Sequence, residues 1–281
     1  MIIIAESGST KCDWAQCTKK GDLLETYQTI GFNPKYTSCK SMLNELSKIK
    51  LNKIKHLVTE VFFYGAGCSS IEKNKIIKKP LSLFFSNAKI NIKHDLDAAI
   101  KATYDGSPMI CCILGTGSNS CIYNGQEIIK NGPSLGYILG DEASGNYFGK
   151  RLINLYVNKR LPESIIKKFQ RWTNEREEEI IQKIYTSQKP NLYLASFFPF
   201  IYQNKNEKVF DQMIKDGIQC FFNIHIKCFK DHIKYPITFV GSVAFLLSDY
   251  IHKIAKQEQL SINKIVKSPI YKLIETHFNT N

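Results

Sequence analysis

One stretch, residues 109–145, limits what this 281-residue chain can fold into more than any other. It opens with an unbroken apolar run, Met-Ile-Cys-Cys-Ile-Leu, which predicts a buried strand. The run stops at Gly115-Thr-Gly-Ser-Asn119. Glycines at 115 and 117 permit positive φ angles and close backbone approach, so neighbouring N–H groups and hydroxyls can converge on one anion. The pattern therefore predicts a strand followed by a phosphate-binding turn.

The end of the same stretch, residues 136–145, reads Gly-Tyr-Ile-Leu-Gly-Asp-Glu-Ala-Ser-Gly. We expect a short apolar strand over 136–139, then two carboxylates, Asp141 and Glu142, and a helix that starts near Ser144. The turn at 115–119 offers hydrogen-bond donors, whereas this segment offers acceptors. A solvated loop would also explain the two carboxylates, and that alternative stays open.

Short apolar strands that end at a glycine or a carboxylate recur elsewhere. They lie at residues 1–11, 58–68, 89–95 and 237–244. The first is a hairpin whose turn, Glu6-Ser-Gly-Ser-Thr-Lys11, is rich in backbone donors and hydroxyls. An ordinary hairpin loop is the plain alternative. The carboxylate of Glu6 favours phosphate binding, because a metal ion bound to phosphate needs such a ligand.

Helical spacing of apolar residues fills most of the remaining chain. The expected helices are 38–48, 70–85 with an interruption at Pro80, 96–103, 144–158, 163–170, 175–185, 192–202, 207–229 and 268–277, with a short strand at 264–266. Strands and helices thus form one unit up to about residue 105 and a second that opens at Met109. Two such units that face a common cleft would place their strand-end loops around one ligand.

The composition excludes several classes of protein. A net charge of +13 could indicate nucleic-acid binding, but only four of the basic residues are arginines and the lysines are scattered, so we expect no nucleic acid. Nine cysteines without a Cys-x-x-Cys pair predict reduced thiols rather than zinc. No apolar run approaches the roughly 20 residues that span a bilayer, and no signal-peptide pattern is present, so we expect a cytoplasmic protein without a membrane partner.

Seven motifs follow one another along nearly the whole chain. They are Glu6-Ser-Gly-Ser-Thr-Lys-Cys-Asp-Trp14, Gly31-Phe-Asn33-Pro, Phe63-Tyr-Gly-Ala-Gly-Cys68, His94-Asp95, Gly115-Thr-Gly-Ser-Asn119, Leu139-Gly-Asp-Glu-Ala-Ser-Gly145 and Phe239-Val-Gly-Ser-Val-Ala244. In this order they resemble the sugar kinase, Hsp70 and actin superfamily. More narrowly, the chain resembles the N-acetylglucosamine kinase group, which is related to the BadF/BadG/BcrA/BcrD type of ATPase.

The resemblance implies an α/β fold with two actin-like ATPase (ribonuclease H-like) domains that flank an interdomain cleft. Residues 1–107 would form the N-terminal domain, rejoined by a C-terminal helix at 268–281. Residues 108–267 would form the nucleotide-binding domain, with a helical insert at about 150–235. The implied activity is transfer of phosphate from ATP, with Mg²⁺, to the 6-hydroxyl of an N-acetylated amino sugar, N-acetylglucosamine before others. A homodimer is the default oligomeric state.

The resemblance also implies roles for individual residues. Asp95 would be the catalytic base, and Glu6 with Asp95 would hold the metal. The residues implied to bind the sugar are Asn33, Ala66, Thr116, Asn119 and Asp141. The residues implied to bind ATP are Ser7, Gly8, Ser9, Thr10, Lys11, Gly115, Thr116, Gly117, Gly241 and Ser242.

Plainer interpretations of these residues stay open. Asp95 could cap the helix at 96–103, Asn119 could serve its own turn, and Gly241 could form an ordinary strand-to-helix turn. The family pattern usually has Asp where this chain has Glu6, and the extra methylene moves the carboxylate by about a bond length. A catalytically weakened sugar sensor is therefore one alternative function. An ATPase that activates a partner enzyme is another, although such activators carry paired cluster cysteines that this chain lacks.

Overall fold

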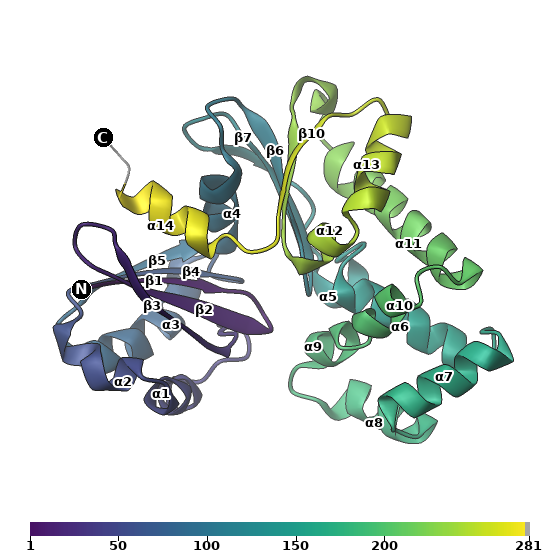
Figure 1. Cartoon of the computed structure of the whole chain (residues 1–281), viewed down its shortest axis with the longest axis horizontal. Helices are drawn as coiled ribbons and strands as arrows, with labels where there is room; N and C mark the ends of the chain where they lie inside the picture. The colour runs from purple at the N-terminus through teal and green to yellow at the C-terminus, as the bar shows by residue number, and fades with distance from the viewer. Residues whose placement is uncertain (279–281) are drawn as a thin grey trace. The chain divides into compact units, whose positions relative to one another are not determined.

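In a computed structural model, which describes residues 1–278, the chain forms two compact α/β units (Figure 1). Unit 1 comprises residues 1–105 together with the segment that starts at Ser268, and unit 2 comprises Gly106–Lys267. Each unit is built on a five-stranded mixed sheet. Within residues 1–278, no helix combines the length and the apolar character needed to cross a bilayer.

The sheet of unit 1 has the order β3-β2-β1-β4-β5. Its strands are β1 (Ile2–Ser7), β2 (Lys11–Cys17), β3 (Leu23–Ile30), β4 (Glu60–Gly65) and β5 (Lys89–His94). Strand β1 is antiparallel to β2 and parallel to β4, which is parallel to β5. The centre of β1 is apolar and fully buried, because helices cover both faces of the sheet at this strand.

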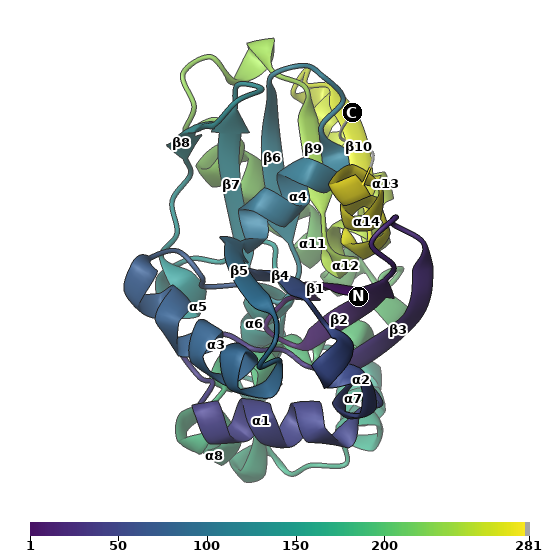
Figure 2. The same cartoon turned by 90° about the vertical axis from the view of Figure 1, so that its left-hand side faces the viewer.

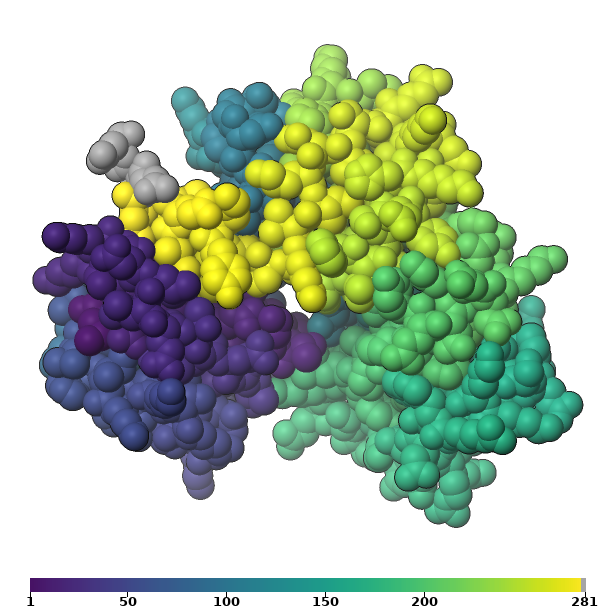
Figure 3. Space-filling model, in the orientation of Figure 1, coloured from purple at the N-terminus to yellow at the C-terminus, as the bar shows by residue number. Residues whose placement is uncertain are grey.

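One face of this sheet packs on the helices that connect its strands, α1 (Cys39–Lys48), α2 (Leu51–Ile54) and α3 (Ile71–Phe84). The other face packs on α4 (Asp95–Thr103) and on α14 (Ile270–Phe278), as Figure 2 shows for α1, α3 and α4. The C-terminal helix α14, yellow in Figure 3, lies against the purple N-terminal strands. The last helix of the chain therefore completes the core of the first unit.

Unit 2 repeats this topology with the order β8-β7-β6-β9-β10 and the same strand directions. Its strands are β6 (Met109–Leu114), β7 (Ser118–Tyr123), β8 (Ile128–Asn131), β9 (Ile237–Val240) and β10 (Ile262–Val266). Because the order and directions match strand for strand, the turn after β6 corresponds to the turn after β1. The N-terminal hairpin and the 115–119 turn are thus equivalent positions of one repeated fold.

The helices of unit 2, apart from the exposed helical turn α5, pack with its sheet in one large core. They are α5 (Gly136–Leu139), α6 (Gly145–Val157), α7 (Glu163–Thr173), α8 (Glu177–Thr186), α9 (Pro190–Ala195), α10 (Phe198–Gln203), α11 (Lys208–Phe221), α12 (Ser242–Leu246) and α13 (Ser248–Gln257). A π-helical turn, Phe222–Ile226, extends α11, and 3-10 turns lie at Lys55–Leu57 and His232–Lys234.

The expected strand at 136–139 is wrong, because this segment is the helical turn α5. Gly136 has a φ of +73°, and the N–H of Gly140 closes the turn on the Gly136 carbonyl at 2.8 Å. Ile138 and Leu139 are about 70% exposed, so the apolar residues that suggested a buried strand lie at the surface. Strands β3, β7 and β8 lie outside the expected ranges. Most residues of β3 and β8 are exposed and show no apolar alternation, and β7 is largely buried but begins with three polar residues, Ser118, Asn119 and Ser120.

Three helix predictions also need correction. Pro80 does not interrupt α3, because its ring is buried beside Ile77 and Leu81 and this packing offsets the lost backbone hydrogen bond. The helix expected at 192–202 is two helices, with Pro199 in the first turn of the second. The long helix expected at 207–229 leaves α-helical geometry after Phe221.

Candidate active site

In unit 1 the candidate residues meet at one edge of the sheet. The register pairs Ser7 with Gly65 and Gly65 with His94, so β1, β4 and β5 end side by side. Glu6, Ala66 and Asp95 therefore lie at neighbouring strand ends. The N–H of Ala66 donates to the Ser7 carbonyl at 2.8 Å, which ties the second of these ends to the first.

The hairpin turn at 8–10 rests on the segment 31–33. A Cβ at Gly31 would come within 2.2 Å of the Gly8 carbonyl oxygen, so only glycine allows this approach. Ser7 Oγ accepts from the N–H of Phe32 at 2.8 Å and donates to its carbonyl at 3.2 Å. The Ser7 hydroxyl is thus used within the protein. Lys11 Nζ lies 2.6 Å from Asp13 Oδ2.

Asn33 reaches the same edge. A Cβ at Gly67, whose φ is +80°, would come within 2.8 Å of Asn33 Oδ1. The same oxygen accepts from the N–H of Lys35 at 3.0 Å, which fixes the amide against the loop after β4. Asn33 and Ala66, which the sequence assigns to the sugar, therefore lie next to each other.

Asp95 is the first residue of α4, and the N-cap is His94. The capping box is completed by Asp97, whose Oδ2 accepts from the His94 N–H at 3.0 Å, so the alternative of Asp95 as the helix cap is wrong. His94 Nδ1 lies 3.0 Å from Asp95 Oδ1, but the same nitrogen accepts from the Leu96 N–H. Asp95 Oδ1 thus has no hydrogen-bond donor among the described residues.

Burial raises the pKa of both carboxyl groups at this edge, Glu6 and Asp95. It raises the pKa of Glu6 to about 8, and the charges of Asp13 and Asp95 act in the same direction. Burial also raises the pKa of Asp95, although the His94 ring opposes this. Two carboxylates that repel each other in a buried place are stabilised when a cation binds between them.

In unit 2 the turn after β6 lies on the start of α6. The Gly145 N–H donates to the Gly115 carbonyl at 2.8 Å, and the Asn146 N–H donates to the Thr116 carbonyl at 3.1 Å. Asn146 Nδ2 donates to the same Thr116 oxygen at 2.7 Å. Neither Gly115 nor Gly117 has a positive φ, so the turn does not use the left-handed conformation that these glycines permit.

Glycine at 117 leaves room for the Asp141 carboxylate, which lies against its backbone. Asp141 Oδ2 accepts from Asn146 Nδ2 at 2.7 Å, and Oδ1 accepts from the Ser118 N–H at 3.3 Å. Burial raises the pKa of Asp141, and these two hydrogen bonds partly oppose the shift. Asp141 is therefore fixed on the 115–119 turn and is no solvated loop residue.

Gly241 brings β9 and α12 to the same turn. Its φ is +129°, and a Cβ there would come within 2.3 Å of the Leu114 carbonyl oxygen. Ser242 begins α12 directly after it. Asn119 lies on β7 opposite Ile113, and its Oδ1 accepts from the Ser120 N–H at 2.9 Å. The unit 2 candidates therefore surround one turn, with Asn119 on the strand that leaves it.

Asn146 and Lys150 were not anticipated from the sequence. They lie four residues apart on α6, and Lys150 Nζ donates to the Tyr137 carbonyl. Burial lowers the pKa of Lys150, whereas the nearby Asp141 and Glu142 charges raise it. The sequence did contain a signal for these two residues: Asn146 and Lys150 are four residues apart on a predicted helix that directly follows a glycine turn.

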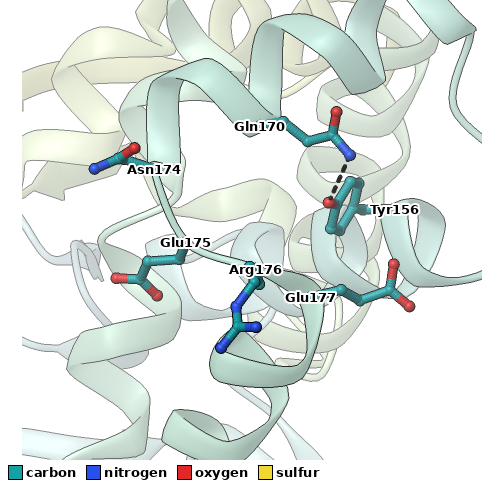
Figure 4. A pocket seen from close by; sticks show the side chains of 6 residues that line it. All are labelled: Tyr156, Gln170, Asn174, Glu175, Arg176 and Glu177. Carbon is teal, nitrogen blue, oxygen red and sulfur yellow. Dashed lines mark hydrogen bonds between the residues drawn. The ribbon is translucent and has the colours of Figure 1, made fainter.

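The described residues contain no group of three or more His, Cys, Asp or Glu side chains arranged to hold a metal. A hollow of about 380 Å³ lies elsewhere in unit 2, between α6, α7 and the start of α8 (Figure 4). Its Gln170 amide donates to the Tyr156 hydroxyl at 3.3 Å, and its Glu175 accepts from Tyr193. None of the candidate residues lines it, so we do not assign the reaction there.

A search of solved structures found a candidate N-acetylglucosamine kinase from Porphyromonas gingivalis that is 32% identical over 100% of this chain and 99% of that one, with a TM-score of 0.91. The chain belongs to the N-acetylglucosamine kinase family. It is a sugar kinase. The actin-like α/β fold expected from the sequence is confirmed.

Two solved structures of lower sequence identity share the fold of this chain. A candidate N-acetylglucosamine kinase from Chromobacterium violaceum is 16% identical, covers 98% of each chain and has a TM-score of 0.73. A ROK family glucokinase from Streptomyces griseus, in complex with glucose and AMPPNP, is 13% identical over 98% of this chain and 97% of that chain, with a TM-score of 0.57. Neither a scan of protein-family models nor a search of curated proteins found a match.

Proposed function

We propose that this kinase transfers the γ-phosphoryl group of ATP to the 6-hydroxyl of an N-acetylated amino sugar, with N-acetylglucosamine as the first candidate. One observation carries the chemical part of the proposal: the Asp95 carboxylate lies at a strand end, and one of its oxygens has no hydrogen-bond donor within residues 1–278. The sugar class is supported by the identity with the Porphyromonas gingivalis protein.

In the proposed reaction, the Asp95 carboxylate accepts the proton of the sugar 6-hydroxyl. The sugar oxygen forms a bond to the γ-phosphorus, the bond from that phosphorus to the β,γ-bridging oxygen breaks, and ADP leaves with the electron pair. Backbone N–H groups of the turns at 8–10 and 116–117 would bind the phosphates, since the Gly115 N–H donates to the Gly117 carbonyl. Such positioned donors stabilise the charge that builds up during transfer.

Mg²⁺ fits the donor set of unit 1. Glu6 and Asp95 are hard oxygen ligands at the ends of β1 and β5, with the end of β4 between them. Burial raises the pKa of both carboxyl groups, so a cation would relieve an unfavourable pair of charges. When bound, Mg²⁺ would neutralise charge on the phosphates of ATP. The side chain of Glu6 is longer than the Asp of the family pattern, which favours a metal held at an adjusted distance or through water.

The sugar-binding candidates of each unit offer polar groups that suit the hydroxyls of a sugar. Asn33 and Ala66 offer an amide and a backbone in unit 1, and Asp141 and Asn119 offer acceptors and donors in unit 2. We propose that unit 2, with its helical insert at about 150–235, is the nucleotide-binding domain and that Gly241 and Ser242 contact the adenosine.

The test is ADP release from Mg-ATP with a panel of sugars: N-acetylglucosamine, N-acetylmuramic acid, glucosamine, N-acetylmannosamine and 6-deoxy-N-acetylglucosamine. We expect turnover that depends on an N-acetylated sugar and is absent with the 6-deoxy analogue. Turnover without any sugar would instead support an ATPase that activates a partner. Sugar binding without turnover, measured by calorimetry, would support a sugar sensor whose catalytic activity is weakened because Glu6 stands where the family pattern has Asp.

A further inference from the structure

His225 lies in the π-helical turn Phe222–Ile226 and is 2% exposed. Its Nε2 lies 2.8 Å from Glu142 Oε2, and its ring stacks on Phe221 with the ring centroids 4.7 Å apart. Since Glu142 is the acceptor, Nε2 carries the hydrogen; Nδ1 has no hydrogen-bond partner among the described residues. π-Helical turns are rare and are frequent at functional sites. The pair is 83 residues apart in sequence and joins the end of α11 to the loop before α6.

The loop that Glu142 belongs to has an unfavourable backbone. Asp141 has a φ of +59° and Ala143 a φ of +57°, so two residues that are not glycine occupy the left-handed region on either side of Glu142. Such a conformation persists only where surrounding contacts impose it. Three side chains supply these contacts: His225 binds Glu142, Asn146 binds Asp141, and Lys150 binds the Tyr137 carbonyl.

The backbone of His225 also supports β7. Ser120 Oγ donates to the His225 carbonyl at 2.8 Å, and Ser120 directly follows Asn119. A Cβ at Gly132 would come within 2.1 Å of the same Ser120 oxygen, so this part of the sheet is closely packed around the contact. His225 therefore touches, through its ring and its carbonyl, the segments that carry two of the three unit 2 sugar candidates, Asp141 and Asn119.

We propose that the His225–Glu142 pair is a positioning device for the sugar: it holds the Asp141 loop in its left-handed conformation without touching the substrate. This inference rests on the proposed function, in which Asp141 binds the amino sugar. The 115–117 turn also has backbone hydrogen bonds to the start of α6 that do not involve His225, so loss of the pair should weaken sugar binding more than ATP binding.

Two substitutions that differ by one methylene test the proposal. Gln at 225 places an N–H donor near the position of Nε2, whereas Asn places its amide near Nδ1, which has no partner. We expect His225→Asn to raise the KM for N-acetylglucosamine at least tenfold, with the KM for ATP within twofold of wild type. His225→Gln should restore the sugar KM to within threefold of wild type. His252→Gln, at an exposed histidine on α13, is the matched control and should change neither constant.

Thermal unfolding of each variant shows whether it is folded before kinetics are measured. If His225→Asn does not fold, Glu142→Asp, which withdraws the carboxylate from the ring, is the deciding variant and should show the same rise in sugar KM. Equal KM values for N-acetylglucosamine in His225→Asn and His225→Gln would overturn the proposal. It would also be overturned if His225→Asn and Glu142→Asp both failed to fold, since the pair would then serve folding in general. Absence of sugar-dependent turnover in the wild type would instead refute the proposed function.

Discussion

The carboxylate of Asp141 lies against the backbone of Gly117, so closely that a methyl group at 117 would come within 2.9 Å of Asp141 Oδ2. The φ of Gly117 is not positive, so this contact, and not backbone conformation, requires glycine at the position. The sugar candidate and the phosphate-binding turn of unit 2 are therefore parts of one tightly packed arrangement.

Gly117→Ala should displace Asp141 and raise the KM for the sugar about tenfold, which corresponds to about 1.4 kcal/mol. Gly115→Ala is the matched control, because a Cβ at 115 meets no atom within 4 Å. Steady-state kinetics with varied sugar at saturating ATP measure the effect. An unchanged sugar KM in Gly117→Ala would show that Asp141 does not bind the sugar.

Asp95→Asn should lower kcat by about 10²–10⁴, because the carboxylate that accepts the proton is removed. Sugar and ATP binding, measured by calorimetry, should remain. Asp97→Asn alters the neighbouring capping carboxylate and should lower stability by up to about 1 kcal/mol with little effect on kcat. A kcat of Asp95→Asn close to that of the wild type would mean that another group accepts the proton.

Glu6→Asp should lower the Mg²⁺ concentration needed for half-maximal turnover, because the shorter side chain matches the length common in the family. The measurement is a magnesium titration of sugar-dependent ADP release at fixed ATP. An identical magnesium curve for the two proteins would show that the longer side chain of Glu6 is already accommodated.

The metal-free protein should lose stability as the pH rises from 6.5 to 8. Burial raises the pKa of Glu6 to about 8 from an ordinary value of 4.5, so the folded state binds a proton that the unfolded state has released. The free energy of unfolding therefore falls with rising pH by roughly 1–2 kcal/mol over this window, and the loss ends above the folded pKa. Urea denaturation at several pH values measures it.

Glu6→Gln should flatten this pH dependence, since the amide binds no proton in either state. The window starts at 6.5 because His277 acts oppositely below that value. Burial lowers the pKa of His277 to about 4 from its ordinary 6.5, so stability falls there as the pH decreases. An equally steep decline between pH 6.5 and 8 in Glu6→Gln would assign the effect to other groups.

The sequence allowed the positions of the strand-end turns to be predicted, because an apolar run that stops at glycine is a local pattern. Glu6, Asp95 and Gly241 follow such runs, and each lies at the end of a strand or directly beyond it. The repeated sheet order was not predictable from that pattern, since it depends on pairing between distant strands. The exposed residues of β3 and β8 gave no apolar alternation to mark them.

The contacts that hold the site residues in place could not be predicted from local sequence patterns either. His225 meets Glu142 across 83 residues, and no spacing rule predicts such a pair. The apolar residues of α5 suggested a buried strand, but they lie exposed beside the Asp141 loop. Asn146 and Lys150 were within reach of helical spacing, yet only the folded loop shows that they hold Asp141 and Tyr137.

Transfer of a labelled γ-phosphoryl group decides whether this protein is an amino-sugar 6-kinase. The protein is incubated with γ-labelled Mg-ATP and N-acetylglucosamine, the products are separated, and the attachment site is read by phosphorus–proton NMR. We predict label on the sugar at the 6-oxygen, with at least a hundredfold less in Asp95→Asn, in line with the loss of a general base. Label found only in inorganic phosphate, or on another sugar oxygen, would contradict the proposed reaction.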